Sequence, residues 1–212
     1  MNQKLVVVID YGMGNLRSVA KAAEYAAPDN VRILVTNTPE DVDSADAVIF
    51  PGQGAAKACM QALHDTRMIH SIQKAAQEKP FLGICMGLQV LMTHSDENQG
   101  IDCLNVLPGK VKQFDFADNS SLKVPHMDWN QIHQTREHAL WQKIPQESRF
   151  YFVHSYYTEP EDPAMIAGTT THGITFPSVL SHKNVFAIQA HPEKSAEHGL
   201  QLFKNFLEWR GQ

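Results

Sequence analysis

Short apolar runs alternate with longer amphipathic stretches over the first half of the chain. The apolar runs are rich in β-branched residues and predict buried strands at residues 4–9, 31–35, 45–50 and 80–84. Residues 16–27 and 55–78 repeat apolar side chains at helical spacing, with a break expected near Asp65, and a further helix is expected from residues 88–93. Strands that alternate with helices predict a largely parallel sheet with helices on both faces.

The pattern changes near residue 100, where strand-like segments begin to follow one another. They lie at residues 110–114, 149–157, 174–180 and 185–189, and the polar segment 115–121 is expected to be a mobile loop. A last helix is expected to start near Ser195, a residue type that favours N-cap positions. The chain is therefore expected to form one α/β domain over residues 1–212. It would have three layers, a mostly parallel central sheet and additional antiparallel strands in its second half.

The composition narrows the function classes. A hydrophobic fraction of 43% over 212 residues suffices for a full core and excludes a disordered chain. The net charge of −5, with no basic stripe, argues against nucleic acid as the main partner. No apolar run is long enough to span a membrane, and the start of the chain lacks the pattern of a signal peptide. We therefore expect no membrane association and a cytoplasmic location.

The chain has three cysteines, Cys59, Cys85 and Cys103, without a CxxC pair. This usage fits a reducing compartment and predicts neither a disulfide framework nor a structural zinc site. Cys59 falls in a predicted helix and Cys103 in a loop region, and both are interpreted as small packing residues.

Cys85 stands in a setting typical of a nucleophile. The segment 83–87 reads G-I-C-M-G between a predicted strand and a predicted helix, which is the arrangement of a nucleophile elbow. Flanking glycines allow a sharp turn, and the positive end of the following helix favours a thiolate. The backbone N–H of Met86 would then be available to a developing oxyanion. The competing interpretation is a buried structural cysteine with two incidental glycines.

A thiol nucleophile needs a base, and among eleven histidines the context singles out His191. It follows the apolar run 185–190 and opens the sequence His-Pro-Glu. In an extended segment residues i and i+2 share a face, so Glu193 is expected to bond one imidazole nitrogen while the other faces the thiol. A surface His-Pro-Glu at a strand end is the competing interpretation. His126 and His154 are interpreted as structural and the remaining histidines as solvated, and no cluster has metal-ligand spacing.

A second loop is a candidate for oxyanion binding. Residues 51–54 read P-G-Q-G and end the third predicted strand. Two glycines allow the backbone to approach a ligand and a peptide to flip, so the N–H of Gln53 is expected as a second oxyanion donor. An ordinary turn would have the same composition.

Seven segments spread over the chain carry a resemblance to a known family. They are YGMGNL at 11–16, PGQGA at 51–55, GICMGLQ at 83–89, PHMDWN at 125–130, YFVHSY at 151–156, GTT at 168–170 and HPEKS at 191–195. Together they resemble the class I, triad-type glutamine amidotransferases. The segments 125–130 and 151–156 resemble in particular the glutaminase subunits of imidazole glycerol phosphate synthases.

The resemblance implies a fold like that of the class I amidotransferases and a role for each motif. Cys85 would attack the side-chain amide of L-glutamine, forming a thioester and releasing ammonia. His191 would move the proton and Glu193 would orient His191. Four further residues would hold the glutamine: Gly52, Gln89, Ser155 and Tyr156. No cofactor or metal is implied.

A partner chain is also implied. The sequence has no phosphate-binding loop and no dinucleotide fingerprint, so the ammonia is expected to be used on another chain. The resemblance implies a heterodimer with a barrel cyclase subunit, which makes imidazole glycerol phosphate and an aminoimidazole carboxamide ribotide in L-histidine biosynthesis. Four positions match the interface of that family: Asn15, Trp129, Tyr151 and Lys194. We expect a glutaminase that stays nearly silent until a backbone flip at 52–54 completes the oxyanion hole.

One residue departs from the family pattern, and three alternatives stay open. Asp128 replaces the usual glycine of the segment 125–130, which concerns the partner contact rather than the triad, and Asp tolerates positive φ better than most residues. Met86 stands where the family more usually has Leu or Ile, which is a mild apolar replacement. The first alternative is an amidotransferase that serves another synthase, for pyridoxal phosphate or a surface sugar. The second is a cysteine hydrolase of similar α/β architecture, and the third is a binding protein that kept the fold.

Overall fold

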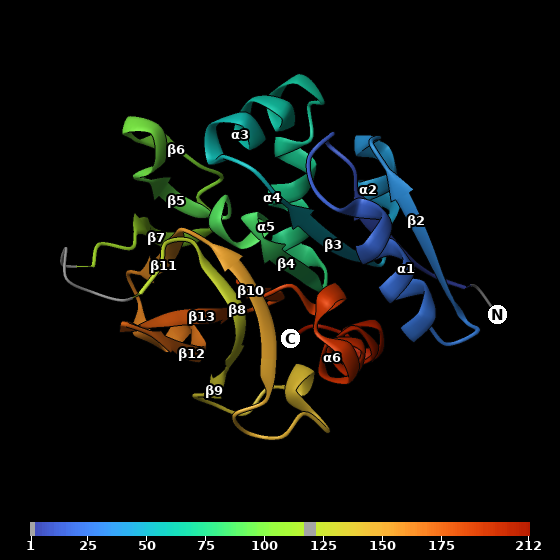
Figure 1. Ribbon diagram of the computed structural model, residues 1–212. Helices are drawn as coiled ribbons and strands as arrows, with labels where there is room; N and C mark the ends of the chain where they lie inside the picture. The colour runs from blue at the N-terminus through green and yellow to red at the C-terminus, as the bar shows by residue number, and fades with distance from the viewer. Residues whose placement is uncertain (1–2, 117–121) are drawn as a thin grey trace.

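The computed structural model describes residues 3–116 and 122–212 and is built on an eight-stranded sheet (Figure 1). The strand order is β2-β1-β3-β4-β14-β13-β12-β9. Its parallel part comprises β1 (Lys4–Ile9), β2 (Val31–Thr36), β3 (Ala47–Gly52), β4 (Phe81–Cys85) and β14 (Val185–Ile188). Its antiparallel extension comprises β13 (Ile174–His182), β12 (Ile166–His172) and β9 (His133–Gln134). The expected mostly parallel sheet with later antiparallel strands is confirmed.

Two smaller sheets complete the second half of the chain. One pairs β8 (His126–Gln131) with β10 (Arg149–His154). The other has the order β11-β7-β5-β6 and consists of β11 (Tyr156–Pro160), β7 (Leu107–Gln113), β5 (Met92–Ser95) and β6 (Ile101–Asp102). The expected single strand at 149–157 is therefore two strands, which divide at Ser155 and join different sheets.

Helices cover both faces of the large sheet, as expected. One face carries α1 (Leu16–Ala26) and α6 (Ala196–Glu208), which pack side by side. The other carries α2 (Pro39–Ser44), α3 (Ala56–Asp65) and α4 (Ile69–Glu78). Alternate residues of β1 divide between the two layers, because successive side chains of a strand point to opposite faces. Val6 and Val8 pack on the side of α1, and Val7 and Ile9 pack on the other side.

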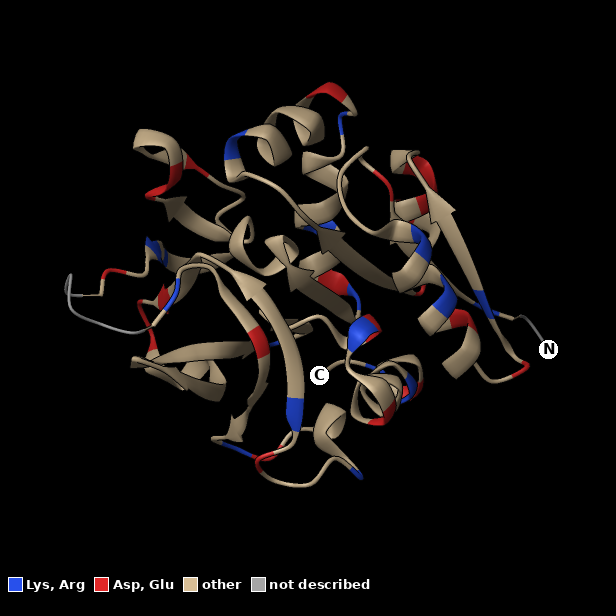
Figure 2. Ribbon diagram, viewed as in Figure 1, with Lys and Arg blue, Asp and Glu red and all other residues tan. Residues whose placement is uncertain are grey.

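The two central strands of the large sheet are free of charge, and charged residues lie on the helices, the connections and the outer strands. β3 and β4 contain no Asp, Glu, Lys or Arg (Figure 2). Burial on both faces explains their uninterrupted apolar sequences. Among the helices of the described residues, none combines the length and apolar character needed to cross a membrane.

The expected helix from residue 88 is wrong beyond its first turn. The helix α5 covers only Met86–Gln89, and the following chain forms β5. The Leu91 carbonyl accepts hydrogen bonds from the N–H groups of Val106 and Leu107. The chain of residues 104–107 therefore satisfies backbone groups that would otherwise have continued the helix. The helical segment 55–78 does break near Asp65, between α3 and α4. Most of the expected mobile loop, residues 117–121, lies outside the described residues.

The sheet brings the candidate motifs to one edge. Gly52 at the end of β3 pairs in register with Cys85 at the end of β4. On the other side of β4, Ile188 of β14 pairs with Ile84. Because parallel strands end at the same edge, the chain that follows Ile188 toward His191 leaves the sheet beside Cys85.

Candidate active site

Cys85 occupies a strained turn between β4 and α5. Its backbone has φ 55° and ψ −110°, a region that side-chain-bearing residues seldom adopt. The expected strand–turn–helix arrangement of an elbow is present. Gly87 is required at this place, because a Cβ atom there would lie 2.0 Å from the carbonyl oxygen of Phe50. The elbow thus depends on close packing of α5 against the backbone of β3.

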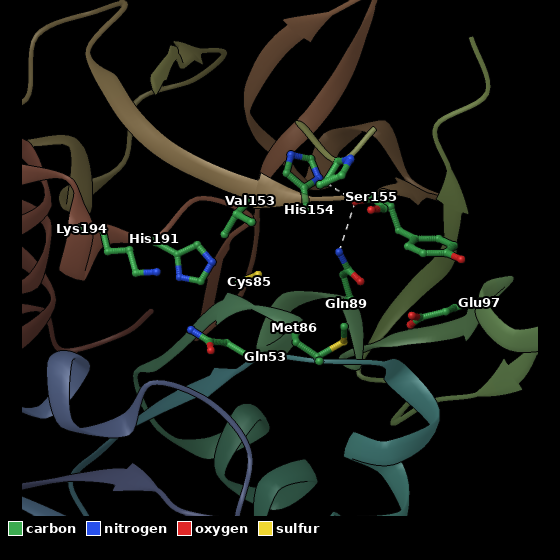
Figure 3. Close-up of a pocket in the computed structure, with 13 residues that line it drawn as sticks. Gln53, Cys85, Met86, Gln89, Glu97, Val153, His154, Ser155, His191 and Lys194 are labelled. Carbon is green, nitrogen blue, oxygen red and sulfur yellow. Dashed lines mark hydrogen bonds between the residues drawn. The ribbon is translucent and has the colours of Figure 1, made fainter. Parts of the chain in front are cut away.

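His191 and Glu193 form a buried hydrogen-bonded pair. His191 Nδ1 lies 2.8 Å from Glu193 Oε1, and the two side chains are only 2% and 1% exposed. The other imidazole nitrogen points toward Cys85 (Figure 3). Burial by itself would lower the pKa of His191, but the Cys85 thiolate and the Glu193 carboxylate outweigh it and raise the pKa to about 10. The arrangement therefore favours the imidazolium form of His191.

The local structure that pairs His191 with Glu193 differs from the expected extended segment. β14 ends at Ile188, and Pro192–Lys194 form a 3₁₀ turn, η4. The turn brings residues i and i+2 together in place of a strand.

Ser195 stands at the N-cap position of α6, as expected, but its hydroxyl makes no capping bond. The hydroxyl donates to the His191 carbonyl at 2.6 Å and accepts from the Tyr151 N–H at 3.0 Å. The His191 N–H donates to the Tyr151 carbonyl at 2.8 Å. These bonds fix the His191 backbone to β10 and to Ser195.

The loop after β3 lies against the elbow. Gly52 itself sits behind the pocket wall, and a Cβ there would approach the Tyr11 hydroxyl to 2.3 Å. Gln53 and Gly54 line the pocket, and Gly54 has φ +94°. The Gln53 carbonyl accepts a hydrogen bond from the Cys59 thiol of α3 at 3.4 Å. The backbone of the loop is therefore held by a helix that lies outside the pocket.

A pocket of about 440 Å³ opens in front of Cys85 and His191. Of the residues expected to hold glutamine, Gln89, Ser155 and Tyr156 line it. The Gln89 Nε2 group donates to the Tyr156 carbonyl at 3.2 Å and to Gln189 Oε1 at 3.0 Å. Gln89 Oε1 is buried without a hydrogen-bond partner among the described residues. This oxygen is available to accept a hydrogen bond from a ligand.

Glu97 also lines the pocket, and sequence reasoning missed it. It opens the 3₁₀ turn η1 (Glu97–Gln99), and its Oε2 accepts the Ala56 N–H at 2.7 Å. The short helix and the return through β5 carry Glu97 to the wall of the pocket. A helix continuing from residue 88 would have placed it elsewhere, so no signal in the sequence pointed to it.

Three of the four expected interface residues lie together beside the site. The rings of Trp129 and Tyr151 pack edge to face, with 6.2 Å between their centres. Lys194 Nζ lies 5.7 Å from the centre of the Tyr151 ring. Trp129 is 37% exposed, and Lys194 also lines the pocket. Asn15 is the N-cap of α1, which contacts the turn η4 that carries Lys194, and it follows Gly14, which packs on Gly52.

Asp128 is exposed on β8 and does not have positive φ. Its carboxylate accepts the Trp129 N–H at 2.7 Å. The replacement of glycine therefore introduces no backbone strain at this position.

The remaining histidines divide in a way that the sequence did not fully indicate. His126 and His154 are buried, in keeping with their structural interpretation. His138, expected to be solvated, is half-buried, and its Nδ1 accepts the Leu140 N–H at 3.1 Å. Burial lowers the pKa of His138 to about 4, so it is neutral at physiological pH.

The assembled groups suit acyl transfer through a thiol. A sulfur on a strained turn, a buried imidazole beside it and a carboxylate that fixes the imidazole tautomer are the parts of a cysteine triad. The pocket adds the Glu97 carboxylate and the free oxygen of Gln89, which are acceptors for an ammonium or amide group.

The comparisons with known proteins agree with this geometry. The model of the family described as glutamine amidotransferase class-I matches residues 7–209. A protein of Hydrogenovibrio crunogenus named imidazole glycerol phosphate synthase subunit HisH is 66% identical, covering 100% of this chain and 99% of its own length. A protein of Nitrosococcus oceani with the same name is 53% identical, with 97% and 98% covered.

Solved structures show the same fold at low sequence identity. A structure described as PurLQS from Thermotoga maritima has a TM-score of 0.70 at 17% identity and covers 98% of this chain and 99% of its own. One described as a glutamine amidotransferase has a TM-score of 0.71 at 16% identity, with 95% and 97% covered. With the family model matched over nearly its whole length and close relatives matched from end to end, the chain belongs to the class-I glutamine amidotransferase family.

Proposed function

We propose that the chain is the glutaminase subunit of an imidazole glycerol phosphate synthase, which hydrolyses L-glutamine to glutamate and ammonia for L-histidine biosynthesis. The observation that carries the chemistry is the placement of Cys85 and His191 in the wall of one pocket, with the buried carboxylate of Glu193 bonded to His191. The full-length relatives that bear the name of that synthase subunit support the substrate and the pathway.

The reaction begins with a proton transfer. His191 takes the proton of the Cys85 thiol, and the thiolate attacks the side-chain amide carbon of glutamine. The amide oxygen becomes an oxyanion, which the backbone N–H groups of Met86 and Gln53 stabilise. When the C–N bond breaks, His191 returns its proton to the leaving nitrogen, ammonia departs and a thioester remains. His191 then takes a proton from water, which attacks the thioester and releases glutamate and the thiol.

The rest of the pocket recognises the amino-acid end of glutamine. Glu97 is the anionic acceptor for the α-ammonium group, and Gln89 Oε1 accepts a further N–H. Ser155 and Tyr156, which line the same pocket, supply donors for the α-carboxylate. Gly52 shapes the loop without reaching into the pocket. A ligand with both charges is therefore held at its far end while its amide reaches Cys85.

The ammonia is used by a barrel cyclase subunit in a heterodimer. The name of the relatives, a synthase subunit, supports a second chain. Trp129, Tyr151 and Lys194 form an aromatic and cationic surface directly beside His191, and we assign it to the cyclase contact together with Asn15. Docking there would act on the backbone at 52–54 and complete the oxyanion hole. Loss of one oxyanion donor costs on the order of a hundredfold in rate, so this flip is a sufficient switch.

Glutamate release from glutamine tests the proposal. The purified chain is measured alone, with the cognate cyclase, and with cyclase plus its nucleotide substrate. Strong activation only in the last mixture is the expected result. Equal activity in all three would contradict the gating, and no activation by this cyclase would indicate an amidotransferase that serves another synthase.

A further inference from the structure

Gln189 is a fully buried polar residue that lies between the glutamine pocket and the nucleophile. It follows β14, two residues before His191, and is 0% exposed. Its Oε1 accepts a hydrogen bond from Gln89 Nε2 at 3.0 Å. Its Nε2 donates to the sulfur of Cys85 at 3.7 Å. The amide thus contacts the reacting atom directly.

The orientation of this amide follows from a backbone carbonyl. The Tyr156 carbonyl can only accept, so the Gln89 group that contacts it at 3.2 Å must be the NH₂ (Figure 3). The same NH₂ group reaches Gln189, so the Gln189 atom that faces it must be the oxygen. The Gln189 NH₂ is then left facing Cys85. Exchanging the oxygen and nitrogen of either amide would leave at least one of these three contacts without a matching donor and acceptor.

A pair of neutral histidines supports the Tyr156 carbonyl from the other side. His154 Nδ1 donates to this carbonyl at 2.7 Å, which leaves His154 Nε2 as an acceptor for His126 Nδ1 at 3.0 Å. Burial lowers the pKa of His126 to about 4 and that of His154 to about 3, so neither ring gains a second proton near pH 7. Asn130 Nδ2 donates to the remaining nitrogen of His126 at 3.2 Å. A continuous network of hydrogen bonds therefore connects β8 with the sulfur, and the Tyr156 carbonyl accepts from both sides of it.

We propose that Gln189 is a further catalytic residue, whose amide N–H donates a hydrogen bond to the Cys85 sulfur and stabilises the thiolate against the thiol. A hydrogen bond to an ionised acceptor is stronger than one to the neutral form, so the contact favours loss of the thiol proton. His191 stabilises the thiolate through its positive charge. Gln189 stabilises it through a hydrogen bond from an amide that does not titrate. The catalytic meaning of this contact rests on the proposed glutaminase function.

The decisive experiment measures ionisation of Cys85 in the full-length chain with Gln189→Met. The rate of alkylation by iodoacetamide is followed against pH, and the Cys85 peptide is quantified by mass spectrometry. We expect the pH midpoint of Cys85 labelling to rise by about one pH unit, since the donor to the charged sulfur is lost. The titratable groups that act on Cys85 are His191, Tyr11 and Cys59, and all three are retained. An unchanged midpoint would overturn the proposal, because a merely structural role would lower the melting temperature without moving it.

A second variant keeps the test decisive if the methionine variant does not fold. Gln189→Leu has a similar volume and removes the N–H donor to the sulfur without introducing a titratable group. Its labelling midpoint should rise by a similar amount, and a midpoint equal to that of the parent would equally refute the role of Gln189. Gln142→Met, at an exposed glutamine outside the pocket, is the matched control and should leave the midpoint unchanged. Absence of glutamine hydrolysis in the parent would refute the proposed function, while the labelling comparison would still test the contact.

Discussion

Glu193 Oε1 lies 2.8 Å from His191 Nδ1, and the two residues are held in this contact by a single 3₁₀ turn. The bond assigns the Nδ1 proton to the side of the carboxylate and leaves Nε2 for the thiol. In the proposed mechanism the carboxylate also supports the positive charge that the imidazole acquires when it takes the thiol proton. Both effects depend on the second residue after His191, so the turn η4 keeps the two side chains within reach of each other.

Glu193→Gln should reduce glutamine hydrolysis strongly. The amide removes the negative charge that raises the pKa of His191, and its NH₂ group favours the wrong imidazole tautomer. We expect kcat for glutamate release, measured in the presence of the cyclase, to fall on the order of a hundredfold or more. The melting temperature serves as the control for folding. A kcat equal to that of the parent would show that the carboxylate does not act on the base.

Glu97→Gln should affect binding more than chemistry. The variant keeps an oxygen for the Ala56 N–H but loses the charge that we assign to the α-ammonium group of glutamine. We expect KM for glutamine to rise about tenfold or more, with a smaller change in kcat. Steady-state kinetics with the cyclase give both constants. A large loss of kcat at unchanged KM would place Glu97 outside glutamine recognition.

The three thiols should differ sharply toward alkylation. Burial raises the pKa of Cys59 to about 11 and that of Cys103 to about 12, so both remain protonated near neutral pH. Iodoacetamide should therefore label Cys85 first at about pH 7.5, which is about one unit above the usual pKa of histidine. Peptide mass spectrometry locates the label, and excess glutamine should protect Cys85 alone. Faster labelling of Cys59 or Cys103 would contradict this order.

The buried histidine pair should make the fold sensitive to acid. The pKa of His126 is lowered from 6.5 to about 4 and that of His154 from 6.5 to about 3. Between pH 6.5 and pH 4 the unfolded chain binds protons that the folded chain does not, so the free energy of unfolding falls as the pH falls.

The variant His126→Asn tests this dependence, because asparagine keeps a donor for His154 but has no titratable ring. Urea unfolding is measured at several pH values from about 4.5 to about 7, which cover most of that window. The measurements give the slope of the unfolding free energy against pH. This slope is proportional to the number of protons that the unfolded chain binds in excess of the folded chain, and we expect that number to decrease by up to about one. A slope identical to that of the parent would mean that His126 titrates equally in both states.

The turn at Cys85 and the contact between His191 and Glu193 were predictable because their signals are local. Glycines on both sides of Cys85 indicate a tight turn after an apolar run, and His191 and Glu193 are separated by one residue. The expected contact between the last two is present, although the extended conformation invoked for it is wrong. Residues that are two positions apart can come into contact in more than one local structure. The contact could therefore be predicted, but the backbone conformation that makes it could not.

The parts that escaped prediction depend on distant backbone pairing. The apolar run from Leu88 to Met92 is buried throughout, so its pattern does not distinguish a helix from a strand. The return of the chain through β5 follows from hydrogen bonds to residues 105–107, and only this return brings Glu97 to the pocket. Gln189 lies in an apolar run that ends a strand, where nothing local distinguishes a core amide from one that contacts a nucleophile.

Gly87→Ala should disrupt the elbow itself. A methyl group at this position would lie 2.0 Å from the Phe50 carbonyl oxygen, and neither α5 nor β3 can move away without displacing Cys85. We expect a loss of about 3 kcal/mol or more in the free energy of unfolding, together with loss of glutaminase activity. Gly12→Ala is the matched control, because its φ of +83° imposes strain but no atom lies within 4 Å of the added methyl. That variant should lose only about 1 kcal/mol, as expected for left-handed backbone strain alone. Equal losses measured by urea unfolding for the two variants would mean that the close approach of α5 to β3 is not what restricts residue 87 to glycine.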